Sequence, residues 1–118
     1  MENQQNIPWT VYPDPEILGN TASPHILKFQ YCDQCQYKKF VTGAIDKIEK
    51  EFPSAFQYNL YRDKKITGRL EVTLYLNNKF DWGDDGLPIH SKERTKQYIH
   101  DDYPVFLELL DSALNRKE

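Results

Sequence analysis

Apolar and polar residues change their period twice along the central part of the chain. The segment "HILKFQY", which begins at His25, is short and mostly apolar before a turn signal, so it predicts a central β-strand. From Tyr37 to Phe52 apolar residues recur at helical spacing, which predicts an amphipathic helix of about four turns. Pro53 ends this helix because it lacks an N–H and disfavours helical geometry at the residue before it.

Three further runs predict strands. "AFQYNLYR" (55–62) and "RLEVTLYL" (69–76) alternate apolar and polar residues, as a sheet with one core face requires, and "LPIHS" (87–91) is a shorter strand. The loop "DKKITG" between the first two fits two topologies. Its length allows those strands either to pair directly or to flank the first strand.

The chain closes with a second helical pattern. Apolar residues recur at helical spacing from Phe106 to Leu114, with Asp101 or Asp102 as the N-cap and Pro104 in the first turn. The order strand, helix, strand, strand, strand, helix predicts an α/β sandwich in which a four-stranded mixed sheet carries two helices.

Residues 1–24 lack any such pattern and contain four prolines. They predict an extended arm that packs Trp9 or Tyr12 onto a domain spanning residues 25–118. Residues 77–88 are dense in Asn, Asp, Gly and Pro, which predicts an excursion or widened hairpin around Trp82.

Composition narrows the function classes. The 118 residues suit one domain, and no apolar run approaches the roughly 20 residues that cross a bilayer. The N-terminus has no signal-peptide pattern, so we expect a soluble, cytoplasmic protein without a membrane partner. A net charge of -3 disfavours nucleic acid as a partner. The two cysteines cannot form a disulfide scaffold, and their closeness indicates redox or metal chemistry.

Cys32 and Cys35 stand in "YCDQCQY", between the first strand and the first helix. A helix N-terminus stabilises a thiolate, and a spacing of two allows a small disulfide ring to close. By analogy with thioredoxin, Cys32 would be the more exposed, attacking thiolate and Cys35, inside the first helical turn, the resolving one. Lys38 and Lys39 add positive potential there, and Asp33 opposes them.

Two alternatives to a redox couple stay open. The cysteines could join two histidines in a zinc site, although no second closely spaced ligand pair exists, or they could be inert structural thiols. The candidate histidines are His25, His90 and His100. For His90 we expect a local hydrogen bond at the end of a strand.

The motifs "YCDQCQY", "FP", "TGRLEV" and "PIHSK" together resemble the selenoprotein W group, the Rdx family, over about residues 26–113. The resemblance implies a thioredoxin-like fold in a cysteine-containing member. Cys32 and Cys35 match the family's redox pair, and Cys35 stands where some members carry selenocysteine, so the resemblance leaves open which sulfur attacks. Thr67 and Gly68 match a Thr-Gly that the resemblance places beside the redox motif, where we expect substrate to bind.

The resemblance also implies a function. We expect a thiol–disulfide oxidoreductase or redox sensor that exchanges with glutathione or protein thiols and needs no metal or other cofactor, glutathione serving as a co-substrate. The alternative is a non-enzymatic, redox-responsive interaction module that binds a regulatory protein through the insertion near Trp82. The arm, the insertion and the segment "ERTKQY" depart from the family pattern and bear on partners rather than on the cysteine chemistry.

Overall fold

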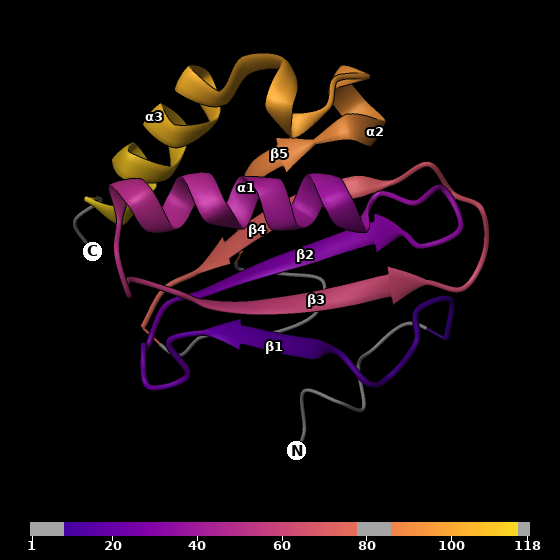
Figure 1. The fold of residues 1–118 in the computed structure, drawn as a ribbon, viewed down its shortest axis with the longest axis horizontal. Helices are drawn as coiled ribbons and strands as arrows, with labels where there is room; N and C mark the ends of the chain where they lie inside the picture. The colour runs from indigo at the N-terminus through magenta and orange to yellow at the C-terminus, as the bar shows by residue number, and fades with distance from the viewer. Residues whose placement is uncertain (1–8, 78–85, 116–118) are drawn as a thin grey trace.

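A computed structural model of the protein describes residues 9–77 and 86–115. Within these residues the chain forms strands, α-helices and a 3-10 helix (Figure 1). Their order is β1 (Glu16–Gly19), β2 (Ile26–Cys32), α1 (Lys38–Glu51), β3 (Gln57–Asp63), β4 (Leu70–Tyr75), β5 (Leu87–Ser91), α2 (Lys92–Thr95), η2 (Ile99–Asp102) and α3 (Tyr103–Leu114).

The strands form one mixed sheet in the order β1-β3-β2-β4-β5. Strand β2 lies at its centre, parallel to β3 on one side and antiparallel to β4 on the other. The two strands joined by "DKKITG" therefore flank β2, which answers the question that the loop length left open. Because β2 is the central strand and ends at Cys32, the cysteine motif follows the C-terminal end of β2, between the ends of its two neighbouring strands (Figure 1).

One hydrophobic cluster joins the sheet to α1 and α3. Helix α1 crosses in front of the sheet, with α3 beside it over β5 (Figure 1). The buried positions of both helices fall on the predicted apolar pattern, namely Val41, Ala44, Ile45 and Ile48 in α1 and Phe106 and Leu110 in α3, whereas Leu109 of the same pattern is 49% exposed. The thioredoxin-like α/β fold expected from the resemblance is confirmed.

The opposite face of the sheet is polar and still largely buried. Lys28 and its register partner Asn59 are only 7% and 6% exposed. The Lys28 ammonium lies 5.6 Å from the centre of the Tyr75 ring, and its burial lowers its pKa to about 8.

Within the described residues the sheet has five strands, where four were expected. The additional strand, β1, pairs antiparallel with β3 and lies within the segment predicted as an arm. It has four residues, mostly exposed, so no alternating pattern marks it. Tyr12, also in this segment, packs against the Arg62 guanidinium at 4.4 Å, whereas Trp9 is 73% exposed. The predicted arm thus supplies an edge strand to the sheet.

The helices differ from the prediction in the segment that follows β5. A short third helix, α2, follows β5, and its N-cap Ser91 accepts a hydrogen bond from the Arg94 N–H. Helix α3 begins as predicted, with Asp102 as its N-cap and proline in the first turn. Trp82 and the core of the predicted insertion lie outside the described residues. Among the described helices, none has both the length and the apolar character of a membrane span.

Candidate functional site

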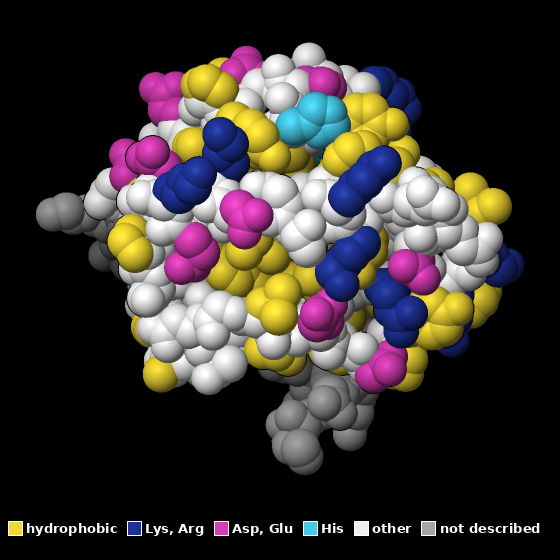
Figure 2. All heavy atoms as spheres, in the orientation of Figure 1, with side chains coloured by type: hydrophobic (Ala, Val, Ile, Leu, Met, Phe, Trp, Pro, Cys, Tyr) yellow, Lys and Arg dark blue, Asp and Glu magenta, His cyan; other side chains and the backbone are white. Residues whose placement is uncertain are grey.

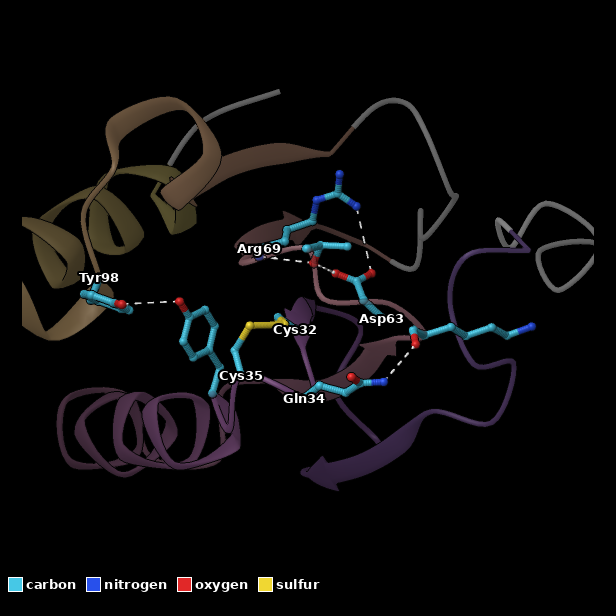
Figure 3. The surroundings of a disulfide bond; sticks show 9 residues. Cys32, Gln34, Cys35, Asp63, Arg69 and Tyr98 are labelled. Atoms are coloured by element: carbon cyan, nitrogen blue, oxygen red, sulfur yellow. Dashed lines mark hydrogen bonds and ion pairs between the residues drawn. A yellow bond between two sulfur atoms is a disulfide. The ribbon is translucent and has the colours of Figure 1, made fainter.

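Cys32 and Cys35 form a disulfide (Figure 3). Their Cα atoms are 5.4 Å apart, within the range that a disulfide spans without moving the backbone. This bond is expected both for a redox-active pair and for a structural disulfide. The surroundings of each sulfur therefore decide what the pair can do.

The two cysteines differ in exposure. Cys32 is the last residue of β2 and is 0% exposed, whereas Cys35 lies in the following loop and is partly exposed. The thioredoxin analogy, which made Cys32 the more exposed residue, is therefore wrong for this disulfide. The reason is that β2 continues through Cys32 and carries it beneath the loop.

The loop that presents Cys35 is not helical. Helix α1 begins at Lys38 with Tyr37 as its N-cap, so Cys35 precedes the first helical turn instead of lying inside it. Gln36 interrupts the path to the helix because its φ of 63° is left-handed, and its N–H closes a turn on the Asp33 carbonyl. The helix dipole, whose effect fades within one turn, acts on Cys35 less than the predicted placement implied.

The charges around the motif are also paired differently from the prediction. The Lys38 ammonium lies 2.6 Å from Glu16 of β1, so its charge is largely compensated. Asp33, between the cysteines, faces Arg62 of β3 at 3.7 Å. These four side chains line an open polar pocket of about 410 Å³ on the arm side of the motif.

Thr67, Gly68 and Arg69 lie beside Cys32, where the resemblance placed the Thr-Gly pair. The Cys32 N–H donates to the Arg69 carbonyl at 2.8 Å. The Thr67 hydroxyl donates to Asp63 at 2.6 Å and accepts from the Arg69 N–H at 3.2 Å. Gly68 has a φ of 68° with open space on its Cβ side. The turn is thus held against β2 by the Cys32–Arg69 hydrogen bond and against Asp63 of β3 by Thr67, and substrate binding there stays a prediction.

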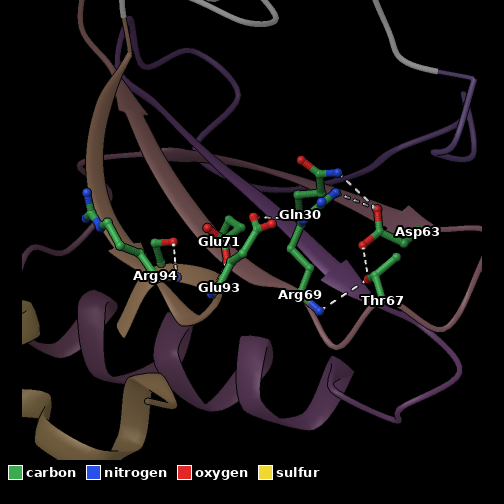
Figure 4. Close-up of polar contacts among 8 residues, drawn as sticks. Gln30, Asp63, Thr67, Arg69, Glu71, Glu93 and Arg94 are labelled. Carbon is green, nitrogen blue, oxygen red and sulfur yellow. Dashed lines mark hydrogen bonds and ion pairs between the residues drawn. The ribbon is translucent and has the colours of Figure 1, made fainter. Parts of the chain in front are cut away.

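The sequence analysis missed Asp63, a carboxylate with 0% side-chain exposure. It is the register partner of Cys32 across the parallel β2–β3 pair. It accepts a hydrogen bond from Gln30 at 3.0 Å and from Thr67, and lies 3.9 Å from the Arg69 guanidinium (Figure 4). Only the strand register brings Asp63 beside Cys32, so an aspartate after "LYR" carried no signal by itself.

Aromatic side chains lie on the other side of Cys35. The Tyr37 and Tyr98 hydroxyls are 3.2 Å apart and share a hydrogen bond, which raises the pKa of Tyr98 (Figure 3). Phe40 and His100 complete the group, with ring centres 4.8 Å apart. Tyr98 and His100 come from the segment after α2, which had given no functional signal in the sequence.

The histidines do not approach the disulfide as a zinc site requires. The His90 ring bonds the Gln97 carbonyl at 2.9 Å, which confirms the expected local contact, and burial lowers its pKa. His25 accepts from the Asn77 N–H. Within residues 9–77 and 86–115, no group of three or more His, Cys, Asp or Glu side chains could hold a metal ion.

Comparison with known protein families identifies the family of this chain. The model of the Rdx family matches residues 26–109, more than half of the 118 residues and a range that includes both cysteines. No curated protein matches the chain at a significant level. The matched range runs from the first residue of the central strand into α3 and so contains the motif, its loop and the Thr-Gly turn. The chain therefore belongs to the Rdx family, a thioredoxin-like redox family, and its Cys32 and Cys35 are joined in a disulfide.

Proposed function

We propose that the protein is a thiol–disulfide oxidoreductase or redox sensor whose disulfide exchanges with glutathione or with protein thiols, and that Cys35 is the sulfur attacked first. The observation that carries the proposal is the difference in exposure within the disulfide: Cys35 is partly exposed on a loop, whereas Cys32 is fully buried. An incoming thiolate needs access to one sulfur in line with the bond that breaks.

The exchange runs in two steps. A glutathione thiolate attacks the Cys35 sulfur; a glutathione–Cys35 bond forms, the Cys32–Cys35 bond breaks, and Cys32 leaves as a thiolate that then takes up a proton. A second glutathione thiolate attacks the glutathione sulfur of this mixed disulfide and releases Cys35. Two glutathiones are oxidised to one glutathione disulfide, and the protein disulfide is reduced to two thiols.

The surroundings of each sulfur support this division of roles. Cys32 is held by the hydrogen bond from its N–H to Arg69, so it can leave and return without moving along the strand. Cys35 lies in a loop of five turn residues that ends at the Tyr37 N-cap, where a mixed disulfide can project outward with little change to the sheet. The same asymmetry lets the reduced protein reverse the reaction, Cys35 then being the attacking thiolate.

A redox titration tests the proposal. The protein is equilibrated with buffers of varied glutathione to glutathione disulfide ratio, quenched by alkylation, and read by mass spectrometry for the state of both cysteines. We expect one reversible transition between dithiol and disulfide within the range of ratios that thiol buffers reach. An unchanged disulfide across all ratios, in protein that an unfolding curve shows to be native, would rule the proposal out.

Single-cysteine variants test the assignment of Cys35. Cys32→Ser should accumulate a glutathione adduct on Cys35 because the resolving sulfur is gone. Cys35→Ser is the matched control and should form the Cys32 adduct at least about tenfold more slowly, since burial keeps reagents from that sulfur. Faster modification of Cys32 would reverse the assignment while leaving the redox proposal intact.

A further inference from the structure

The aromatic side chains beside the redox loop form one continuous patch, which we call the aromatic patch: Tyr37, Phe40, Tyr98 and His100. The ring centres of Phe40 and Tyr98 are 5.1 Å apart, and Tyr98 stacks on His100 at 5.4 Å. Phe40 and Tyr98 are partly exposed and His100 is exposed, so the patch has an outer surface. Figure 2 shows hydrophobic side chains beside a histidine above α1, with cationic side chains next to them.

Two lysines rest on this patch. The Lys39 ammonium lies 5.3 Å from the centre of the Phe40 ring, and Lys92 lies 5.7 Å and 5.1 Å from the rings of Tyr37 and Tyr98. Within the part of the chain that the structure describes, neither lysine has a carboxylate within 4.0 Å, unlike Lys38. Both therefore remain able to pair with carboxylates brought by a partner.

The acidic groups nearby are engaged in contacts of their own, and one of them, Asp101, stays at the patch. The Asp101 carboxylate accepts the Tyr98 N–H at 2.8 Å and lies 4.0 Å from His100. Glu93 faces Arg69 at 3.8 Å and also supplies an N–H to Glu71, and Asp33 faces Arg62. At the aromatic patch the ammonium groups of Lys39 and Lys92 thus outnumber the Asp101 carboxylate, although the whole chain has a net charge of -3.

The aromatic patch is also next to Cys35, whose sulfur is attacked first in the proposed function. Tyr37 follows Cys35 by two residues, and both pack against the same hydrophobic cluster. Figure 3 shows Tyr98 and Cys35 on the same side of the loop, with Asp63 and Arg69 on the side of Cys32. A segment lying across the patch would carry its thiol toward Cys35.

We infer that the aromatic patch with Lys39 and Lys92 docks an acidic, cysteine-containing segment of a partner protein, whose cysteine exchanges with Cys35. This inference rests on the proposed function and names its substrate class. The partner's thiolate attacks the Cys35 sulfur, a mixed disulfide forms between the two proteins, and Cys32 leaves as a thiolate. Apolar side chains of the segment lie on the rings, and its carboxylates pair with the two lysines.

The net negative charge of the chain predicts a preference for basic peptides, whereas the two lysines at the aromatic patch predict a preference for acidic peptides. This difference makes the inference testable. We would measure stopped-flow reduction of the disulfide by two synthetic peptides, acetyl-Glu-Cys-Phe-Glu-amide and acetyl-Lys-Cys-Phe-Lys-amide. Each rate is divided by the same peptide's rate with hydroxyethyl disulfide, which removes differences in thiol pKa. At low salt the acidic peptide should be favoured about fivefold, and the preference should shrink in about 1 M salt because ions screen the charges.

Three variants locate the effect. Lys39→Gln and Lys92→Gln should each remove part of the preference for the acidic peptide, and together most of it. Lys50→Gln is the matched control, because Lys50 is exposed in the last turn of the same helix, about 16 Å along the axis from Lys39. Urea unfolding of each variant confirms that the native state is retained.

The outcomes separate this inference from the proposed function. Equal normalised rates for the two peptides, or a preference for the basic one, would refute the docking surface while leaving exchange chemistry intact. An equal loss in Lys50→Gln would show a general charge effect and would refute it as well. If the native protein resists glutathione and both peptides but is reduced by dithiothreitol, the proposed function itself fails.

Discussion

The two sides of the redox motif are built in opposite ways. Cys32 belongs to the central strand, is fully buried, and lies next to a network in which Asp63 holds Thr67, Gln30 and Arg69 (Figure 4). Cys35 belongs to a loop with a left-handed residue and is bordered by a partly exposed aromatic patch (Figure 3).

If the proposed function holds, this difference lets a small domain make one bond both stable and reactive. The strand side holds one sulfur in place through backbone pairing and a buried polar network, and in the proposed exchange that sulfur is the leaving group. The loop side exposes the other sulfur, where an incoming thiol can reach it. Changes on the strand side should therefore affect stability most, and changes on the loop side should affect reactivity most.

Removing the Asp63 carboxylate should have the largest effect. Asp63→Ala leaves the Gln30 amide, the Thr67 hydroxyl and the Arg69 guanidinium without their buried acceptor, and should lower the free energy of unfolding by about 3 kcal/mol. Urea denaturation of the oxidised protein measures it. Asp14→Ala is the control, since Asp14 is 79% exposed and should cost no more than about 0.5 kcal/mol. Similar losses in both variants would contradict the special place of the strand side.

Reducing the disulfide should have the next largest effect. The bond closes a ring of four residues, so the chain-entropy relation predicts that reduction lowers the free energy of unfolding by about 2 kcal/mol. Urea curves with and without dithiothreitol provide the measurement, with the Cys32→Ser, Cys35→Ser double variant as a reductant-independent check. A reduced protein as stable as the oxidised one would mean that the loop is already ordered without the bond.

Gln36 should give a smaller effect of the opposite sign. A non-glycine residue with a φ of 63° is strained, so Gln36→Gly should raise the free energy of unfolding by about 0.5 kcal/mol. The same substitution should leave the reduction midpoint nearly unchanged, because it touches neither sulfur. The matched site is Ser54, also left-handed at 59° but far from the motif, and Ser54→Gly should stabilise similarly. Destabilisation by both substitutions would refute this account of the loop.

The hydrogen bond between Tyr37 and Tyr98 should have the smallest effect on stability and a clear spectroscopic signature. It is the main cause that raises the pKa of Tyr98, so in Tyr37→Phe this group should ionise at lower pH than in the parent protein. Absorbance titration near 295 nm reads the change, and Tyr12→Phe is the control. A Tyr98 transition that stays in place would show that the hydroxyl contact does not control its ionisation.

The outline of the fold could be predicted from local patterns. A short apolar run marked β2, alternation marked β3 and β4, and helical spacing with Pro53 and Asp102 marked α1 and α3. The position of the cysteine pair could be predicted in the same way, because the strand pattern before it and the helical pattern after it place it between a strand and a helix. These features are local, so neighbouring residues carry enough information to specify them.

Other features could not be predicted because they depend on contacts between distant segments. Strand β1 is short and exposed and exists through its pairing with β3. The start of α1 at Lys38 follows from a backbone turn at Gln36, and glutamine is not a residue that signals a left-handed φ. The helical spacing began at Tyr37, next to the observed start, but it did not reveal the turn that leaves Cys35 outside the first helical turn, where the thioredoxin analogy had placed it.

Period and composition thus specify which segments form the sheet and helices and where the two cysteines stand, since both depend on residues a few positions apart. Which sulfur is buried, which carboxylate lies beside it and which lysines are left unpaired all arise from strand register and from loops that meet only in the folded chain. Asp63 is 31 residues from Cys32 in the sequence and opposite it in the sheet. Such pairings arise when packing satisfies backbone hydrogen bonds and buries the apolar face together, which no single segment can do alone.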